Sequence, residues 1–183
     1  MPEANYVQLP DGRQIGFQEY GDREGVPVFF FHGWIGSRLD FAPNDVIARD
    51  LGVRVIAVDR PGCGASDFKE DRRLLDWPDD VSELADALGF DKFAVCGHSF
   101  GGPYVAACAY QLANRVTSAA IVAGISPLSF KGATRGIAGV RPPCTLARWD
   151  RSGNDPPLCF LDGENGQEPG LDREGDRFPL ARR

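Results

Sequence analysis

The chain has few histidines, no surplus of basic residues and no long apolar run, and each shortage excludes a class of function. Of its 183 residues only 2 are histidine, and the 20 Lys and Arg are outnumbered by 26 Asp and Glu, which gives a net charge of -6. No basic field is available to attract nucleic acid or an anionic membrane surface. We therefore expect neither nucleic acid nor a membrane as a partner.

Paired cysteines and targeting signals are also lacking. The five cysteines are an odd set without C-x-x-C spacing, and with so few histidines we expect no metal site and no cofactor. No apolar run reaches the roughly 20 residues that span a membrane, and residues 1–21 lack the basic start and apolar core of a signal peptide. Together these features predict free thiols and a cytoplasmic location. The cysteines are Cys63, Cys96, Cys108, Cys144 and Cys159.

What is present is a regular alternation of strand and helix patterns over the first two thirds of the chain. Residues 6–9 and 14–20 predict a hairpin at a sheet edge, because alternating apolar and polar residues flank the turn signal at 10–13. Parallel strands need crossover helices, so the later alternation predicts an α/β fold: a mostly parallel sheet with helices on both faces. The predicted strands are 27–31, 53–58, 93–96 and 116–124, and the predicted helices are 44–51, 76–88 and 103–109.

Charged residues in this region have structural explanations. The helix at 76–88 has one apolar stripe, and its carboxylates at 79, 80, 83 and 86 are interpreted as a solvated face. The Gly- and Pro-rich turn at 59–67 follows a parallel strand at the edge where α/β sheets usually bind ligands. For its own side chains, however, turn formation is the favoured interpretation.

Residues 93–102 carry the first candidate for chemistry. An apolar strand turns sharply at Ser99 and becomes a helix, with Gly97 and Gly101 on either side in G-x-S-x-G spacing. Glycine is expected at these two positions because a Cβ would clash where strand and helix backbones approach closely. The alternative is a serine on an ordinary strand-to-helix turn.

Three motifs in order give a resemblance: residues 32–34 (HGW), 59–66 (DRPGCGAS) and 97–102 (GHSFGG). Over residues 6–127 the chain resembles the α/β-hydrolase fold family, in its single-domain esterase, lactonase and peptidase branch. The resemblance implies that Ser99 is a nucleophile and that the amides of Trp34 and Phe100 form an oxyanion hole. It assigns His32 and Gly33 to the binding loop, and it implies a small-molecule acyl substrate.

The chain departs from this family pattern after the serine. Family triads run in the order Ser, acid, His, and no histidine follows Ser99; His32 and His98 are poor candidates for the base. From residue 129 the sequence is rich in Gly, Pro, Arg and Asp, which favours disorder. We therefore expect a core at 1–128 and a tail at 129–183 that is disordered or out of frame. The alternative is a genuine short family member.

Three functions follow as hypotheses. The first is a serine hydrolase by descent that is inactive in this form, because the triad acid and histidine are missing. The second is a non-catalytic protein that binds a small molecule or a partner on the same fold, and the third is a fragment without independent function. If later strands are missing, residues 116–123 become an exposed apolar sheet edge, which predicts self-association.

Overall fold

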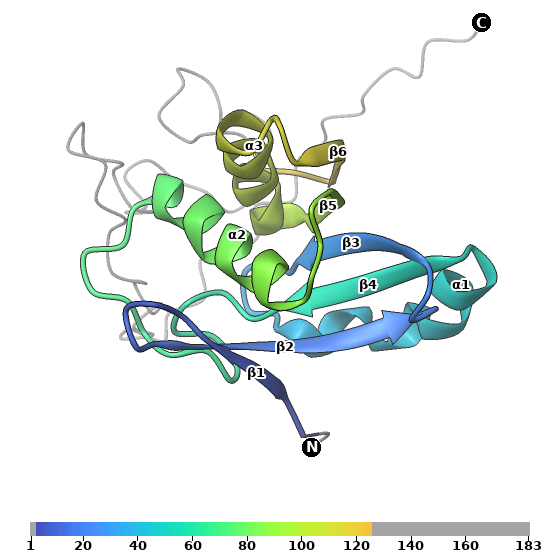
Figure 1. Ribbon diagram of the computed structural model, residues 1–183, viewed down its shortest axis with the longest axis horizontal. Coiled ribbons are helices and arrows are strands. Elements are labelled where there is room, and N and C mark those ends of the chain that lie inside the picture. Colours follow the sequence, from blue (N-terminus) through green and yellow to red (C-terminus); the bar gives the residue numbers. More distant parts are fainter. Residues whose placement is uncertain (1–2, 126–183) are drawn as a thin grey trace, which may run out of the picture.

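The computed structural model describes residues 3–125, which form a six-stranded mixed sheet in the order β1-β2-β4-β3-β5-β6 (Figure 1). Strand β2 is antiparallel to both of its neighbours, and the remaining strand pairs are parallel. The predicted α/β class with a mostly parallel sheet is confirmed. The strands are β1 (Asn5–Gln8), β2 (Gln14–Gly21), β3 (Val26–Phe31), β4 (Val53–Val58), β5 (Phe93–His98) and β6 (Val116–Val122).

The predicted hairpin is present at one edge of the sheet. Strand β1 pairs with β2 from Asn5 opposite Phe17 to Gln8 opposite Gln14. The Leu9 amide donates to the Arg13 carbonyl across the turn, and Gly12 takes the left-handed conformation that this turn requires, with φ of 88°.

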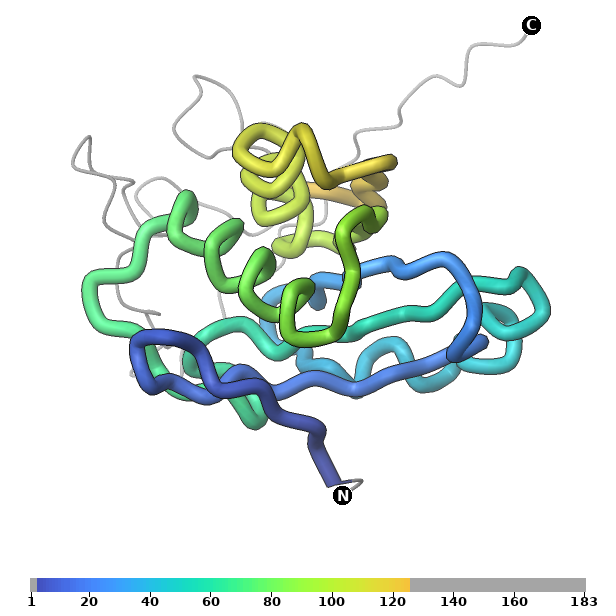
Figure 2. The backbone as a smooth tube through the Cα atoms, viewed as in Figure 1, coloured from blue at the N-terminus to red at the C-terminus, as the bar shows by residue number. Residues whose placement is uncertain are grey.

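Strand β3 is apolar on both faces, and helices cover both. Successive side chains of β3 point to opposite sides of the sheet. The Phe30 ring meets Phe41 of the 3-10 helix η1 (Arg38–Asn44) at 5.1 Å between centroids, whereas Phe31 meets Trp77 of α2 (Trp77–Ala87) at 5.3 Å. Helix α3 (Gly102–Gln111) packs beside α2, as Figures 1 and 2 show, and completes the layer on that face. With η1 on the opposite face, both predicted helical layers are present.

The helix predicted at 44–51 is α1 (Asp45–Asp50), but η1 in front of it was not predicted. Helix η1 begins with a capping box: the Ser37 side chain accepts from a backbone amide in the first turn, and the Asp40 carboxylate accepts from the Ser37 amide. A short η2 (Leu74–Asp76) leads into α2, and η3 (Ser99–Gly101) leads into α3.

Asp80 corrects the interpretation of α2 as having four solvated carboxylates. Its side chain is buried, and Oδ1 accepts from Arg13 Nη2 at 2.6 Å while Oδ2 accepts from Nη1 at 3.2 Å. The reason lies in the helical repeat: Asp80 is three residues after Trp77 and four before Leu84, so it shares their inward face. Arg13, in the turn of the hairpin, supplies the compensating charge.

Strand β6 is the other edge, and it differs from the buried strand that its apolar sequence predicted. Residues 117–122 are exposed, because β6 pairs with β5 on one side and has no strand on the other within residues 3–125. The sequence supports two predictions for this strand: a buried strand from its apolar pattern, and an exposed edge if no later strand covers it. Within residues 3–125 the structure agrees with the exposed edge.

Other sequence predictions meet the structure only in part. Within residues 3–125, no helix combines the length and apolar character needed to cross a membrane, and no group of three His, Cys, Asp or Glu is arranged to hold a metal. Cys63, Cys96 and Cys108 are free. The predicted boundary at 128 and 129, the tail and the other two cysteines lie outside the described residues.

Removing the Asp80 carboxylate tests the buried pair with Arg13. We expect Asp80→Ala to lower the free energy of unfolding by about 1–3 kcal/mol, because a guanidinium is left beside an apolar helix face. Urea denaturation followed by circular dichroism measures it. The matched control is Asp79→Ala, an exposed carboxylate in the same first turn, and equal losses in the two variants would contradict a buried role for Asp80.

Candidate functional site

The turn at residues 97–101, called the elbow below, joins β5 to α3 through η3, as the sequence predicted. Ser99 stands at its tip with φ of 53°, in the left-handed region that residues other than glycine seldom adopt. Such strain is maintained only where the surrounding structure enforces it. The elbow therefore presents the Ser99 side chain at the carboxyl end of a parallel strand.

The two glycines of the elbow are required by close backbone packing, as predicted. A Cβ on Gly97 would lie 2.6 Å from the Gly101 carbonyl oxygen and 2.7 Å from a Val105 methyl carbon. A Cβ on Gly101 would collide with the Phe31 carbonyl at the end of β3. The elbow is thus pressed directly against the strand that leads to the loop at 32–34.

That loop lies over the elbow. A Cβ added to Gly33 would be 3.5 Å from the Ser99 Cβ and 3.4 Å from His98 Nδ1, so a side chain at position 33 would touch both residues. The rings of Trp34 and Phe100 meet edge to face, 4.7 Å apart at an interplanar angle of 79°. The structure therefore brings together Gly33, Trp34, Ser99 and Phe100, all of which the sequence singled out.

His32 lies beneath this loop and is completely buried. Its Nε2 accepts from the Arg60 amide at 3.3 Å, which leaves Nδ1 as the protonated nitrogen that donates to the Gly33 carbonyl at 2.9 Å. Burial, helped by the nearby Arg60 charge, lowers the His32 pKa to about 4. At neutral pH His32 is an uncharged ring that holds the loop in shape.

Arg60 was missed by the sequence prediction of turn formation alone. Its buried Nη2 donates to the Gly33 carbonyl at 2.7 Å and to the Trp34 carbonyl at 3.3 Å, and its guanidinium lies 5.0 Å from the centroid of the Tyr104 ring on α3. Arg60 thus ties the loop at 32–34 to the helix that starts at the elbow. The available signal was a cation two residues after the end of β4.

Asp59, also missed, is a buried carboxylate with several donors around it. Its Oδ1 accepts from the Arg38 amide at 2.6 Å, and its Oδ2 accepts from Arg38 Nη1 and from the Ala65 amide, both at 2.8 Å. Its backbone carbonyl accepts from the Ser66 hydroxyl at 2.7 Å. Asp59 therefore holds both the turn at 59–67 and the start of η1 in place.

His98 is exposed, and its position on the elbow differs from that of His32 in the interior. Two of the described thiols are poor nucleophiles, because burial raises the pKa of Cys108 to about 12 and raises the pKa of Cys96 as well.

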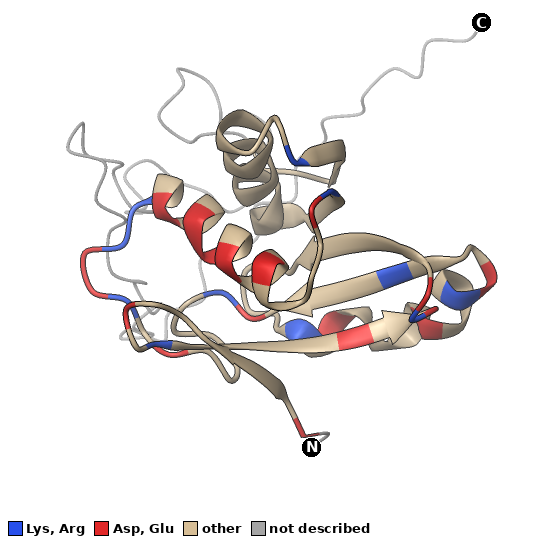
Figure 3. Cartoon of the chain, in the orientation of Figure 1, with Lys and Arg blue, Asp and Glu red and all other residues tan. Residues whose placement is uncertain are grey.

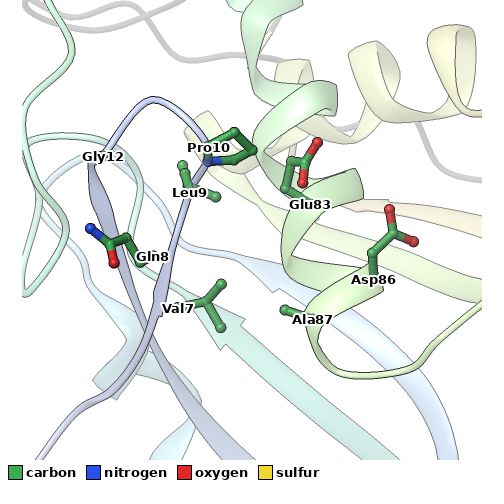
Figure 4. A pocket seen from close by; sticks show the side chains of 8 residues that line it. All are labelled: Val7, Gln8, Leu9, Pro10, Gly12, Glu83, Asp86 and Ala87. Atoms are coloured by element: carbon green, nitrogen blue, oxygen red, sulfur yellow. The ribbon is translucent and has the colours of Figure 1, made fainter.

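A hollow of about 500 Å³ opens elsewhere, between the hairpin turn and α2 (Figure 4). It contains no residue of the elbow or of the loop at 32–34, and its carboxylates are those of Glu83 and Asp86, the latter paired with Arg115. This hollow does not bear on the Ser99 site. Its lining residues are Val7, Gln8, Leu9, Pro10, Gly12, Glu83, Asp86 and Ala87.

Replacement of Asp59 tests its structural role. Asp59→Ala removes the buried carboxylate that accepts from the Arg38 guanidinium and from two backbone amides, so we expect the free energy of unfolding to fall by about 3–5 kcal/mol, with a smaller loss for Asp59→Asn. Urea denaturation measures both. Asp50→Ala, exposed at the end of α1, should change stability by less than about 0.5 kcal/mol. A loss in Asp59→Ala as small as that of the control would contradict the assignment.

The low pKa of His32 predicts a pH dependence of stability. The folded pKa of about 4 lies below the ordinary value of 6.5, so the unfolded chain takes up the proton first as the pH falls. This contribution is complete above pH 6.5 and is lost towards pH 4, with a total of about 3 kcal/mol. Denaturation from pH 4 to 7 should show a flatter profile for His32→Asn than for the wild type. An equally steep profile in His32→Asn would refute it.

Comparisons with known proteins agree with this geometry. The family model described as alpha/beta hydrolase fold matches residues 26–164. The chain is 36% identical over 130 residues to a non-heme chloroperoxidase from Streptomyces lividans, covering 70% of this chain and 47% of the relative. It is 34% identical over 128 residues to a bifunctional esterase/perhydrolase from Acinetobacter calcoaceticus, covering 69% and 46%.

Among solved structures, a hypothetical protein from Pseudomonas aeruginosa superposes with a TM-score of 0.60 at 29% sequence identity, over 72% of this chain and 47% of that one. The chain thus spans about half the length of the curated relatives it matches. The mostly parallel sheet, the strained serine at the end of β5 and the family match over more than half of the sequence lead to one conclusion. This chain belongs to the α/β-hydrolase fold family.

Proposed function

We propose that this chain carries a serine-nucleophile site for acyl transfer, directed at an ester or related acyl bond of a small molecule. One observation carries the proposal: Ser99 is held at φ of 53° on a strand-to-helix turn, close to the loop that contains Gly33. In this arrangement the hydroxyl is presented at the carboxyl end of β5, and the following helix begins directly behind it. Relatives named as an esterase/perhydrolase and as a proline iminopeptidase support acyl chemistry.

The second part of the proposal is an oxyanion hole made of the Trp34 and Phe100 amides. Neither N–H takes part in the loop and cap hydrogen bonds of residues 3–125, and Phe100 lies in the first turn of a helix, where amides have no partner within the helix. Donors fixed in advance cost no reorganisation when charge develops, and removal of one such donor costs about 3 kcal/mol. Arg60 and His32 hold the loop that supplies the Trp34 amide.

The described residues provide no clear general base for Ser99. Serine needs a general base at neutral pH, and both ring nitrogens of His32 are engaged with backbone groups. His98 is exposed, and no histidine follows Ser99 in these 183 residues. Loss of the base costs on the order of 10⁶ in kcat, while the oxyanion hole and binding alone leave roughly 10³ to 10⁴ over water. We therefore expect these 183 residues to turn over esters slowly.

The same observation favours a second candidate, a non-catalytic binding protein that uses this site for a small molecule without consuming it. The two candidates are distinguished by whether Ser99 becomes acylated.

A cytoplasmic location remains a prediction from the sequence.

Chemical rescue tests the nucleophile independently of the missing base. With p-nitrophenyl acetate, we expect added imidazole to accelerate acetylation of Ser99, because the free base can take the hydroxyl proton while the fixed amides stabilise the oxyanion. Peptide mass spectrometry locates the acetyl group, and release of nitrophenol gives the rate. Ser99→Ala should lose the adduct and at least about tenfold of the protein-dependent rate.

The matched control is Ser118→Ala, an exposed serine on β6, which should behave as the wild type does. Without Ser99 acetylation under rescue, acyl transfer is excluded and the binding candidate is favoured. Fast hydrolysis without imidazole that depends on Ser99 would show that a base exists in the chain, and His98→Asn would then identify or exclude His98.

A further inference from the structure

The end of the sheet built from β5, α3 and β6 is almost free of charge. From residue 93 to residue 125 the chain has one Lys, Arg, Asp or Glu, which is Arg115. Arg115 does not reach the open face: it donates to Asp86 at 2.7 Å, to the Ser82 hydroxyl at 2.8 Å and to the Phe90 carbonyl at 2.6 Å. Figure 3 shows the contrast with α2, which carries a row of acidic residues.

This uncharged end carries an open strand edge. Strand β6 pairs with β5 from Ser118 opposite Ala94 to Val122 opposite His98, and no strand of residues 3–125 pairs with its other side. Ile121 and Val122 are 52% and 53% exposed, and Tyr110 on the neighbouring α3 is 77% exposed. A long edge without charge, proline or burial is a template for another strand, because its outward N–H and C=O groups pair with no other strand of the described residues.

The opposite edge of the sheet is less suited to pairing. Strand β1 has four residues, with Glu3 just before it and Pro10 soon after β1 ends. Short strands, nearby charges and proline are the features that block pairing at sheet edges. On β6 the one irregularity is the register shift between Phe93 and Ala94, near Thr117, and the five residues that follow are paired regularly with β5.

We propose that β6 is an interface for a second copy of this chain, with the two β6 strands pairing antiparallel about a two-fold axis. The occupant follows from charge. Each copy has a net charge of -6, which opposes association of two copies in general, whereas residues 93–125 at this end include no carboxylate that would face its own image. A two-fold contact places the same patch on both subunits, and a strand without charged side chains opposes itself without penalty.

Sedimentation velocity on the full chain of 183 residues at micromolar concentrations tests this. We expect a monomer–dimer equilibrium, and we expect Ala120→Lys to weaken it at least about tenfold, because two like charges meet across the paired strands. Ala120 is exposed, so the lysine fits the monomer. The matched control is Val46→Lys, an exposed position on α1 that adds the same charge and should leave the equilibrium unchanged.

Hydrogen exchange provides the second measurement. The amides of β6 should become more protected as the protein concentration rises, and this increase should be absent in Ala120→Lys. A monomer at all concentrations overturns the proposal, and protection of β6 in that monomer would assign the edge to residues 126–183 of the same chain. A dimer that Val46→Lys dissociates and Ala120→Lys does not would assign the contact to α1 and also overturn it. None of these outcomes depends on acyl transfer at Ser99.

Discussion

The buried carboxylate of Asp59 is the interaction on which the site end of this fold depends. It is enclosed at the end of β4, where an isolated charge would be costly, and it is stabilised by the Arg38 guanidinium and two backbone amides. The same residue accepts the Ser66 hydroxyl through its backbone carbonyl, and its own amide donates to Gly16 on β2. The Asp59 carboxylate thus connects η1 to the turn at 59–67, and its backbone connects that turn to the hairpin.

Arg60, the next residue, connects this turn to the proposed active site. Arg60 reaches from the turn to the Gly33 and Trp34 carbonyls, and its backbone amide fixes the His32 ring, so the loop over Ser99 is held from below by polar contacts. Its guanidinium is enclosed by carbonyls and by the Tyr104 ring and has no carboxylate partner among the ion pairs of residues 3–125. A cation bound in this way is positioned by the fold and in turn positions the loop.

The sequence predicted what local patterns encode. Strand β3 was predicted from its apolar run, which reflects helices on both of its faces, and the sharp turn at Ser99 was predicted from the glycines on either side. The pairing of Arg13 with Asp80 could not be predicted, because the two residues are 67 positions apart and no local repeat reports a distant partner. For Arg60 the only signal was a cation after a strand, because its acceptors depend on how the loop at 32–34 folds over it.

The backbone at Ser99 has a further consequence, for anyone who would stabilise this protein. A residue with a Cβ pays about 1–3 kcal/mol to remain in the left-handed region, and glycine does not. A screen that selects for thermal tolerance alone would therefore favour glycine at position 99. The selected variant would lack the hydroxyl. At position 99, stability therefore favours glycine, whereas the proposed chemistry requires serine.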